Sequence, residues 1–163
     1  MAVLLLLLTG CDTEEKVTWS GGDLRGVNHT QLGIGRFSVN GSGGPNISPF
    51  GEGGGACCIS LPDKWQPALK AQVEWEVDPD PYAKLPPLGT DEYREAYRKH
   101  AANYKKYRAT VDIPEYGKER CGLTVHFFPC QQIKVTTSCW TYGAQAYPIK
   151  EPREMKEPKV CPK

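Results

Sequence analysis

The segment KAQVEWEVD at residues 70–78 alternates polar and apolar side chains from end to end. Successive side chains of a strand point to opposite faces of a sheet, so this period of two gathers the apolar ones on a single face. That face consists of Ala71, Val73, Trp75 and Val77. The segment therefore predicts a half-buried strand of an antiparallel sheet, with one face in the core and a charged face in water.

Shorter segments of similar character lie on both sides of it. They predict strands at residues 34–39, 57–61, 110–113, 123–128 and 133–137. Two glycine clusters, at 41–45 and 51–55, lie between the first two of these strands. A nucleotide-binding loop would need a following helix and a GK[ST] motif, whereas the second cluster continues into the strand-like A-C-C-I-S. We therefore expect tight turns and close backbone approaches at both clusters.

Residues 91–108 predict the one long helix of the chain. Thr90 is suited to the N-cap, and Asp91 and Glu92 suit the positive end of the helix dipole. Lys105, Lys106 and Arg108 suit its negative end. Together with 17 glycines and 14 prolines, which favour turns and short strands, this pattern predicts a mainly β fold, an antiparallel β-sandwich with one inserted α-helix. The alternative is an α+β two-layer domain in which the helix lies across one sheet.

The N-terminal sequence L-L-L-T-G-C, residues 6–11, resembles a bacterial lipobox. It implies a signal peptide over residues 1–10, cleavage before Cys11, and a lipid on the Cys11 sulfur. The apolar run is too short to span a bilayer, which takes about 20 residues. No Lys or Arg precedes it, so we expect the true start to lie upstream of Met1. The protein would then be anchored on the periplasmic face of a membrane, inner or outer.

The remainder divides into three parts by composition. Residues 11–26 are polar and glycine-containing and predict a lipidated tether, in which Trp19 alone is suited to docking. Residues 27–147 predict the β-rich globular domain. Residues 148–163, rich in Pro, Lys and Glu, predict an extended tail. The chain without its signal, about 150 residues, has a common size for one domain.

Seven cysteines leave six once Cys11 is set aside for the lipid. An even number in an oxidising compartment predicts disulfides among Cys57, Cys58, Cys121, Cys130, Cys139 and Cys161. The pairing stays open, although adjacent residues of a strand point to opposite faces, so we expect Cys57 and Cys58 to have different partners. Cys161 could attach the tail to the domain. The sequence contains no C-x2-C pair and no H-x3–5-H pair, so we expect no metal site.

Catalytic patterns are equally scarce. Hydrolase chemistry needs a nucleophile beside a base, and the candidate bases are His29, His100 and His126. There is no G-x-S-x-G elbow, and the thiols are assigned to disulfides. Alternation places His126 on the polar face of its strand, where we expect a surface or hydrogen-bonded histidine. We expect no enzyme and no cofactor, and the net charge of +1 argues against nucleic acid as a partner.

Two groups of residues are candidates for binding a protein partner. On the predicted helix, one stripe carries Tyr93, Tyr97, His100, Tyr104 and Tyr107. The stripe either packs on the sheet or forms a recognition surface, and both hold if Arg94 and Arg98 face outward. The second group is an acidic patch that could meet a basic partner. It comprises Glu74, Glu76, Asp78 and Asp80, although a solvated outer face would have the same composition.

A longer pattern carries a family resemblance. It runs through V-N-H-T at 27–30, F-S-V-N-G at 37–41, the glycines up to Gly55, the pair Cys57-Cys58, and Trp65 and Trp75. The pattern resembles a proteobacterial lipoprotein family known as domain of unknown function 3304. Some members look like immunity proteins encoded beside type VI secretion phospholipase effectors. The resemblance implies a periplasmic protein that binds and inhibits such a toxin; the alternative is an envelope structural or assembly lipoprotein. It assigns no individual site residue.

Overall fold

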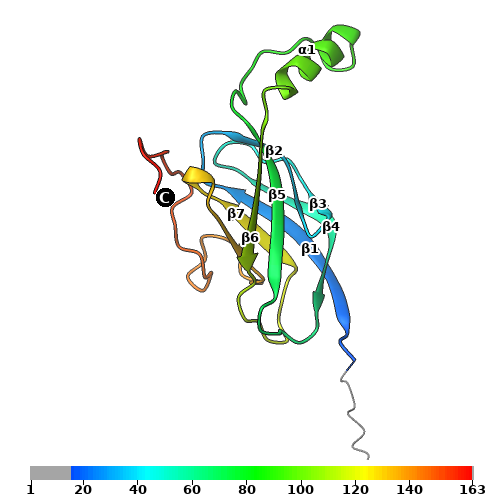
Figure 1. Ribbon diagram of the computed structural model, residues 1–163, viewed down its shortest axis with the longest axis vertical. Helices are drawn as coiled ribbons and strands as arrows, with labels where there is room; N and C mark the ends of the chain where they lie inside the picture. Colours follow the sequence, from blue (N-terminus) through cyan, green and yellow to red (C-terminus); the bar gives the residue numbers. More distant parts are fainter. Residues whose placement is uncertain (1–15, 163) are drawn as a thin grey trace, which may run out of the picture.

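The computed structural model describes residues 16–162 of the chain (Figure 1). The expected signal peptide, the lipidation site Cys11 and the first part of the tether lie outside the described residues. The strands are β1 (Trp19–Asn28), β2 (Gly33–Val39), β3 (Ser42–Gly44), β4 (Glu52–Pro62), β5 (Lys70–Asp78), β6 (Lys105–Asp112), β7 (Leu123–Phe127) and β8 (Ile133–Thr136). One α-helix, α1 (Asp91–Ala101), and a 3-10 turn at Pro129–Gln131 complete the regular elements.

The strands form two four-stranded sheets that face each other. Sheet A has the order β4-β1-β7-β8 and sheet B the order β3-β2-β5-β6. Every pairing is antiparallel except that of β1 with β7, which is parallel. The predicted β-sandwich with one inserted helix is confirmed. The helix lies across neither sheet, so the two-layer α+β alternative is not the architecture.

The core fills the space between the sheets. β5 has the two faces that its alternation predicts, since Ala71, Val73, Trp75 and Val77 are all buried while Lys70, Gln72 and Glu74 are exposed. Phe127 of sheet A reaches across to sheet B, where its ring centroid lies 5.2 Å from that of Phe37 and 5.9 Å from that of Trp75. Aromatic contacts of this kind add to the area buried and fix how the two sheets are aligned.

The predicted tether is wrong from Trp19 onward, because residues 19–26 belong to β1 in the middle of sheet A. The segment W-S-G-G-D-L-R-G-V-N shows little alternation, so its sequence does not suggest a strand. Its glycines instead permit close approach: a Cβ on Gly22 would lie 2.6 Å from the Cα of Gly122, the residue before β7. Hydrogen bonding to β4 on one side and β7 on the other then stabilises the strand.

The predicted helix is too long by seven residues. α1 ends at Ala101, and Lys105–Asp112 forms the edge strand β6, paired with β5 along its whole length. Tyr107, Ala109 and Val111 are partly buried and alternate with exposed neighbours, which is a period of two. The spacing of Tyr104 and Tyr107 fits a helix as well as a strand. The segment forms a strand because the edge of β5 offers it backbone hydrogen-bonding groups.

The C-terminal segment, defined here as residues 137–162, forms neither helix nor strand but is not a loose tail. It runs along sheet A at the β7–β8 side, where Tyr147 and Ile149 are buried against Phe128 (Figure 1). The predicted tail at 148–163 is therefore extended but docked. Among residues 16–162, no helix is both long enough and apolar enough to cross a membrane.

Candidate binding surface and buried histidine pair

The helix stands on an arm, defined here as residues 79–104, that connects β5 to β6 and projects beyond the end of the sandwich (Figure 1). The side chain of Thr90 caps α1 by accepting a hydrogen bond from the backbone N–H of Tyr93 at 3.1 Å. Asp91 and Glu92 occupy the first turn and Arg98, Lys99 and His100 the last, as the helix dipole favours. No residue of α1 is buried.

Hydrogen bonds to one carboxylate attach the arm to sheet B. Asp78, the last residue of β5, is 8% exposed, and its Oδ2 lies 2.9 Å from Nε2 of His100. The Tyr104 hydroxyl donates to the same oxygen at 3.2 Å, while Oδ1 accepts from the backbone N–H of Asp80 at 2.9 Å. Burial, followed by the negative charge of Asp78, raises the pKa of Tyr104, so its hydroxyl stays a donor. Both ends of the arm are thus fixed at one point.

The arm exposes several large side chains. The exposed fraction is 78% for Tyr82, 82% for Leu88 and 43% for Tyr97. The rings of Tyr93 and Tyr97 stack with centroids 5.8 Å apart. We define the arm surface as Tyr82, Leu88, Tyr93, Arg94, Tyr97 and Arg98, all of which are exposed except the half-buried Tyr93. Tyrosine and arginine are the residues that most often dominate the energy of protein interfaces.

The predicted tyrosine stripe is divided among three places. Tyr93 and Tyr97 belong to the arm surface, His100 and Tyr104 to the Asp78 attachment, and Tyr107 to β6, where its ring lies 5.6 Å from that of Trp75. The expectation that the helix packs on a sheet is therefore wrong. Arg94 and Arg98 are both exposed, which is the condition that a recognition surface on this helix requires. Arg94 pairs with Asp91 one turn earlier, whereas Arg98 has no ion pair within residues 16–162.

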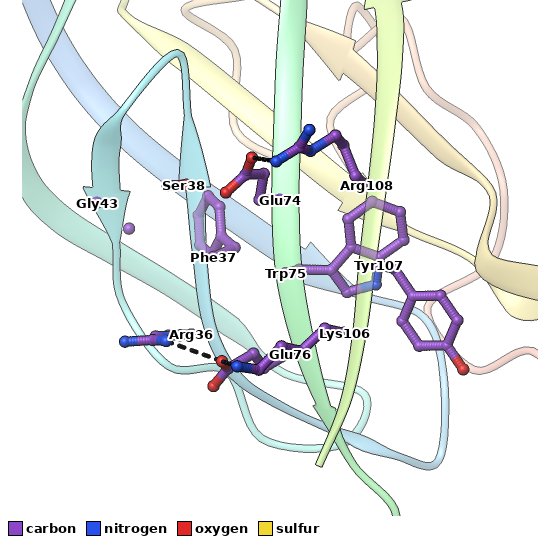
Figure 2. A pocket seen from close by; sticks show the side chains of 11 residues that line it. Arg36, Phe37, Ser38, Gly43, Glu74, Trp75, Glu76, Lys106, Tyr107 and Arg108 are labelled. Carbon is purple, nitrogen blue, oxygen red and sulfur yellow. Dashed lines mark hydrogen bonds and ion pairs between the residues drawn. The ribbon is translucent and has the colours of Figure 1, made fainter.

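The predicted acidic patch does not form a patch of one sign. Glu74 and Glu76 lie on the outer face of sheet B, bordering an open depression of about 580 Å³ (Figure 2). Glu74 pairs with Arg108 at 2.5 Å, and Glu76 pairs with Arg36 at 2.8 Å and with Lys106 at 3.6 Å. Asp78 is buried in the attachment just described, and only Asp80 of the four carboxylates remains exposed without an ion pair in the described part of the chain.

The six cysteines approach one another in three pairs: Cys57 with Cys58, Cys121 with Cys139, and Cys130 with Cys161. The Cα atoms of the second and third pairs are 4.9 and 5.4 Å apart, as disulfides require. The expectation of different partners for the adjacent cysteines is wrong. The last pair does attach the C-terminal segment, as Cys161 suggested. Within residues 16–162, the one group of metal-ligand type is Cys130, Glu157 and Cys161, whose two sulfurs bond to each other.

Sheet A carries a buried polar cluster that the sequence did not predict. His29, directly after β1, and His126, on β7, have no exposed surface. Nε2 of His29 lies 2.8 Å from Nδ1 of His126, and Nε2 of His126 lies 2.7 Å from the Tyr147 hydroxyl. At the other end, Nδ1 of His29 lies 2.7 Å from the Pro152 carbonyl oxygen. Tyr147 and Pro152 belong to the C-terminal segment, so the cluster connects that segment to the sheet.

His126 lies on the side of its strand that alternation predicts. Val125 and Phe127 face the core, and His126 faces outward. Of the two expected environments, a surface or a hydrogen-bonded histidine, His126 has the second, because the C-terminal segment covers this face. Burial lowers the pKa of His126 to about 3, with a further lowering from the neighbouring His29. Burial also lowers the pKa of His29, and it raises the pKa of Tyr147 to about 12. All three groups are therefore neutral near pH 7.

These features define a disulfide-containing β-sandwich protein with a projecting helical arm. The chain belongs to the family described as "Protein of unknown function (DUF3304)", whose family model matches residues 27–135. The matched range begins in β1, ends in β8 and includes the arm, both buried histidines and the pair Cys57-Cys58. No curated protein and no solved structure matches the chain at a significant level.

Proposed function

We propose that this protein is a lipid-anchored periplasmic immunity protein that binds and inhibits a secreted phospholipase toxin. The observation that carries the proposal is the arm: a projecting helix without a buried residue that exposes Tyr82, Leu88 and Tyr97. An isolated helix of 11 residues is marginal in water, and here capping, ion pairs and the Asp78 attachment hold it. A fixed helix loses little entropy on binding, which favours affinity.

The mechanism is occlusion of the toxin. The arm enters or covers the mouth of the lipase active site, with the tyrosine rings as apolar anchors and Arg94 and Arg98 pairing with carboxylates of the toxin. The lipid on Cys11 keeps the inhibitor at the membrane surface that the toxin attacks. Tethering to one surface raises the effective concentration of the inhibitor there without any additional contact.

A titration tests the proposal directly. The oxidised chain from Asp12 onward is titrated against the lipase-type protein encoded beside its own gene, and binding heat and lipase activity are followed together. We expect saturable binding with loss of activity at one-to-one stoichiometry. Absence of binding would refute the immunity function and favour the envelope structural or assembly role.

Two matched double variants test whether the arm contributes to binding. Replacing both Arg94 and Arg98 by Glu should weaken binding about tenfold or more, because it places negative charge at the centre of the arm surface. The control replaces Lys156 and Lys159 by Glu, the same change of charge on the exposed C-terminal segment. Equal loss in both variants would mean that net charge governs the binding; no loss in either would exclude the arm as the interface.

The anchor has its own test. Metabolic labelling with a palmitate analogue should label the wild-type protein in the membrane fraction, and Cys11→Ser should abolish the label. A wild-type protein without label would overturn the lipoprotein part of the proposal and leave the toxin titration as an independent measurement.

A further inference from the structure

The three cysteine pairs differ in how much chain they enclose. Cys121 and Cys139 are 18 residues apart in sequence, and Cys130 and Cys161 are 31 residues apart. Cys57 and Cys58 are adjacent. A disulfide stabilises a fold mainly by removing conformations from the unfolded chain, and the effect grows with the enclosed loop. A bond between neighbours encloses almost nothing, so holding the fold together does not account for this pair.

The adjacent pair lies at an irregularity of an edge strand. β4 is the outermost strand of sheet A, and its register with β1 shifts here: Gly22 faces Ile59, whereas Asp23 faces Cys57. Cys58 is left without a partner on β1, which is a β-bulge. Bulges at sheet edges re-aim side chains and occur often beside active sites. Both cysteines are exposed.

Glycines keep the approach to the pair open. Gly21 on β1 lies beside it, and a Cβ built on Gly21 would be 3.8 Å from the Cβ of Cys58, so that a larger side chain there would lie against this cysteine. Gly55 precedes the pair on β4, and a Cβ built on it would meet nothing within 4 Å. Together with the exposure of both cysteines, these two glycines leave the pair open to an incoming thiolate.

We propose that Cys57 and Cys58 form a redox-active pair that exchanges its disulfide with an external dithiol, while the other two disulfides are structural. In the first step a thiolate of the dithiol attacks one of the two sulfurs. The Cys57–Cys58 bond breaks, a mixed disulfide forms, and the released sulfur takes up a proton. In the second step the remaining thiol of the dithiol attacks the mixed disulfide. Two electrons and two protons thus pass to the cysteines, and the dithiol leaves as a disulfide.

Stepwise reduction of the native protein tests the proposal. The protein is first oxidised with a small-molecule disulfide and then treated with limiting dithiothreitol; free thiols are alkylated at intervals and located by peptide mass. We expect two labels on the peptide that contains Cys57 and Cys58 on the order of tenfold earlier than labels elsewhere. Labelling of this peptide at the same time as the others, or later, would overturn the proposal. The same would follow if Cys57 and Cys58 could still be alkylated after the oxidation step.

A shielding variant separates accessibility from general loosening of the fold. Gly21 has no left-handed backbone conformation, so Gly21→Leu should fold and should slow the reduction of the pair by covering Cys58. Gly43→Leu is the matched control, because a Cβ on Gly43 in β3 of the other sheet would meet nothing within 4 Å. An equal rate in both variants would contradict an exchange site at this surface.

A second part of the experiment distinguishes whether the dithiol is a protein or a small molecule. A protein dithiol of the Cys-X-X-Cys type, with its second cysteine replaced by serine, should be trapped as a mixed disulfide through Cys57 or Cys58. Trapping would identify a protein dithiol as the partner, whereas rapid reduction by dithiothreitol without trapping would restrict the exchange to small dithiols. Trapping through any of the other four cysteines would overturn the assignment.

Discussion

Nε2 of His29 lies 2.8 Å from Nδ1 of His126, and neither imidazole has exposed surface. The Pro152 carbonyl can only accept, so Nδ1 of His29 donates to it and Nε2 of His29 is left as an acceptor. His126 must then donate from Nδ1, and its Nε2 accepts from the Tyr147 hydroxyl. One arrangement of protons therefore satisfies all three hydrogen bonds with both rings neutral. Protonation of either ring would require this arrangement to change.

This cluster predicts a loss of stability in acid. The folded-state pKa of His126 is about 3 against 6.5 in the unfolded chain, so between these values the unfolded state binds more protons. Stability is fully present above pH 6.5 and declines as the pH falls toward 3. At pH 5 we expect the free energy of unfolding to be about 2 kcal/mol lower than at pH 8 from this group alone, and the lowered pKa of His29 acts in the same direction. Urea unfolding at pH 5 and at pH 8 measures this difference in the free energy of unfolding.

A substitution of His126 tests this source directly. His126→Gln should reduce the difference between pH 8 and pH 5 while lowering stability at both. An unchanged difference in His126→Gln would show that the acid sensitivity arises elsewhere, for instance from His29, whose pKa burial also lowers. The carboxyls of Asp63 and Glu151 do not account for a difference between pH 8 and pH 5, because their lowered pKa values contribute stability that is lost only below about pH 4.

Tyr147→Phe tests the other end of the cluster. The substitution keeps the ring but leaves Nε2 of His126 buried without its donor, which should cost about 1–3 kcal/mol of unfolding free energy. The control is Tyr82→Phe, whose ring is 78% exposed and whose loss should stay within about 0.5 kcal/mol. Thermal or urea unfolding at pH 8 compares the two, and an equal change in both would contradict the buried hydrogen bond.

The histidine cluster also shows where sequence reasoning reaches its limit. Alternation along β7 correctly placed Val125 and Phe127 in the core and His126 on the opposite face. Whether that face meets water depends on Tyr147, 21 residues later, in a segment without a periodic pattern. Periodicity can assign a residue to a side of a sheet. It carries no information on what an irregular segment will cover.

The arm shows the same limit of sequence-based prediction. The helix start at Asp91 follows from the cap and charges of the sequence, and the exposure of Arg94 and Arg98 was expected. The end of the helix was not expected, because the pattern after Tyr104 fits both a helical period and a strand period. Pairing with β5 makes this segment a strand. Asp78 was expected to be a surface acid. Its burial depends on His100 and Tyr104, which only the folded arm brings to it.

Asp78→Ala should therefore release the arm without unfolding the sandwich. The substitution removes the acceptor of His100, Tyr104 and the Asp80 amide, leaving the arm held by its two connections and by the packing of the Tyr104 ring against Gly35. We expect faster hydrogen exchange in residues 91–101 and little change in β7, with a loss of global stability of about 1–3 kcal/mol. Glu74→Ala on the same strand loses only an exposed ion pair with Arg108 and should change little. Equal protection of α1 in both variants would contradict the attachment.

The two longer disulfides should account for nearly all the stability that the cysteines supply. Replacing Cys121 and Cys139 by Ser opens a loop of 18 residues and should lower the free energy of unfolding by about 3 kcal/mol, and opening the 31-residue loop of Cys130 and Cys161 should cost somewhat more. Replacing Cys57 and Cys58 together by Ser should cost less than about 1 kcal/mol, because adjacent residues enclose no loop.

Urea unfolding of the three double variants under oxidising conditions gives the ranking. The comparison is informative because each variant removes one pair and keeps the other two, so the redox state of the rest is unchanged. A cost for Cys57 and Cys58 as large as that for Cys121 and Cys139 would mean that these cysteines bridge distant segments in the folded protein. That result would assign them a structural role, and the redox exchange proposed for them would lose its basis.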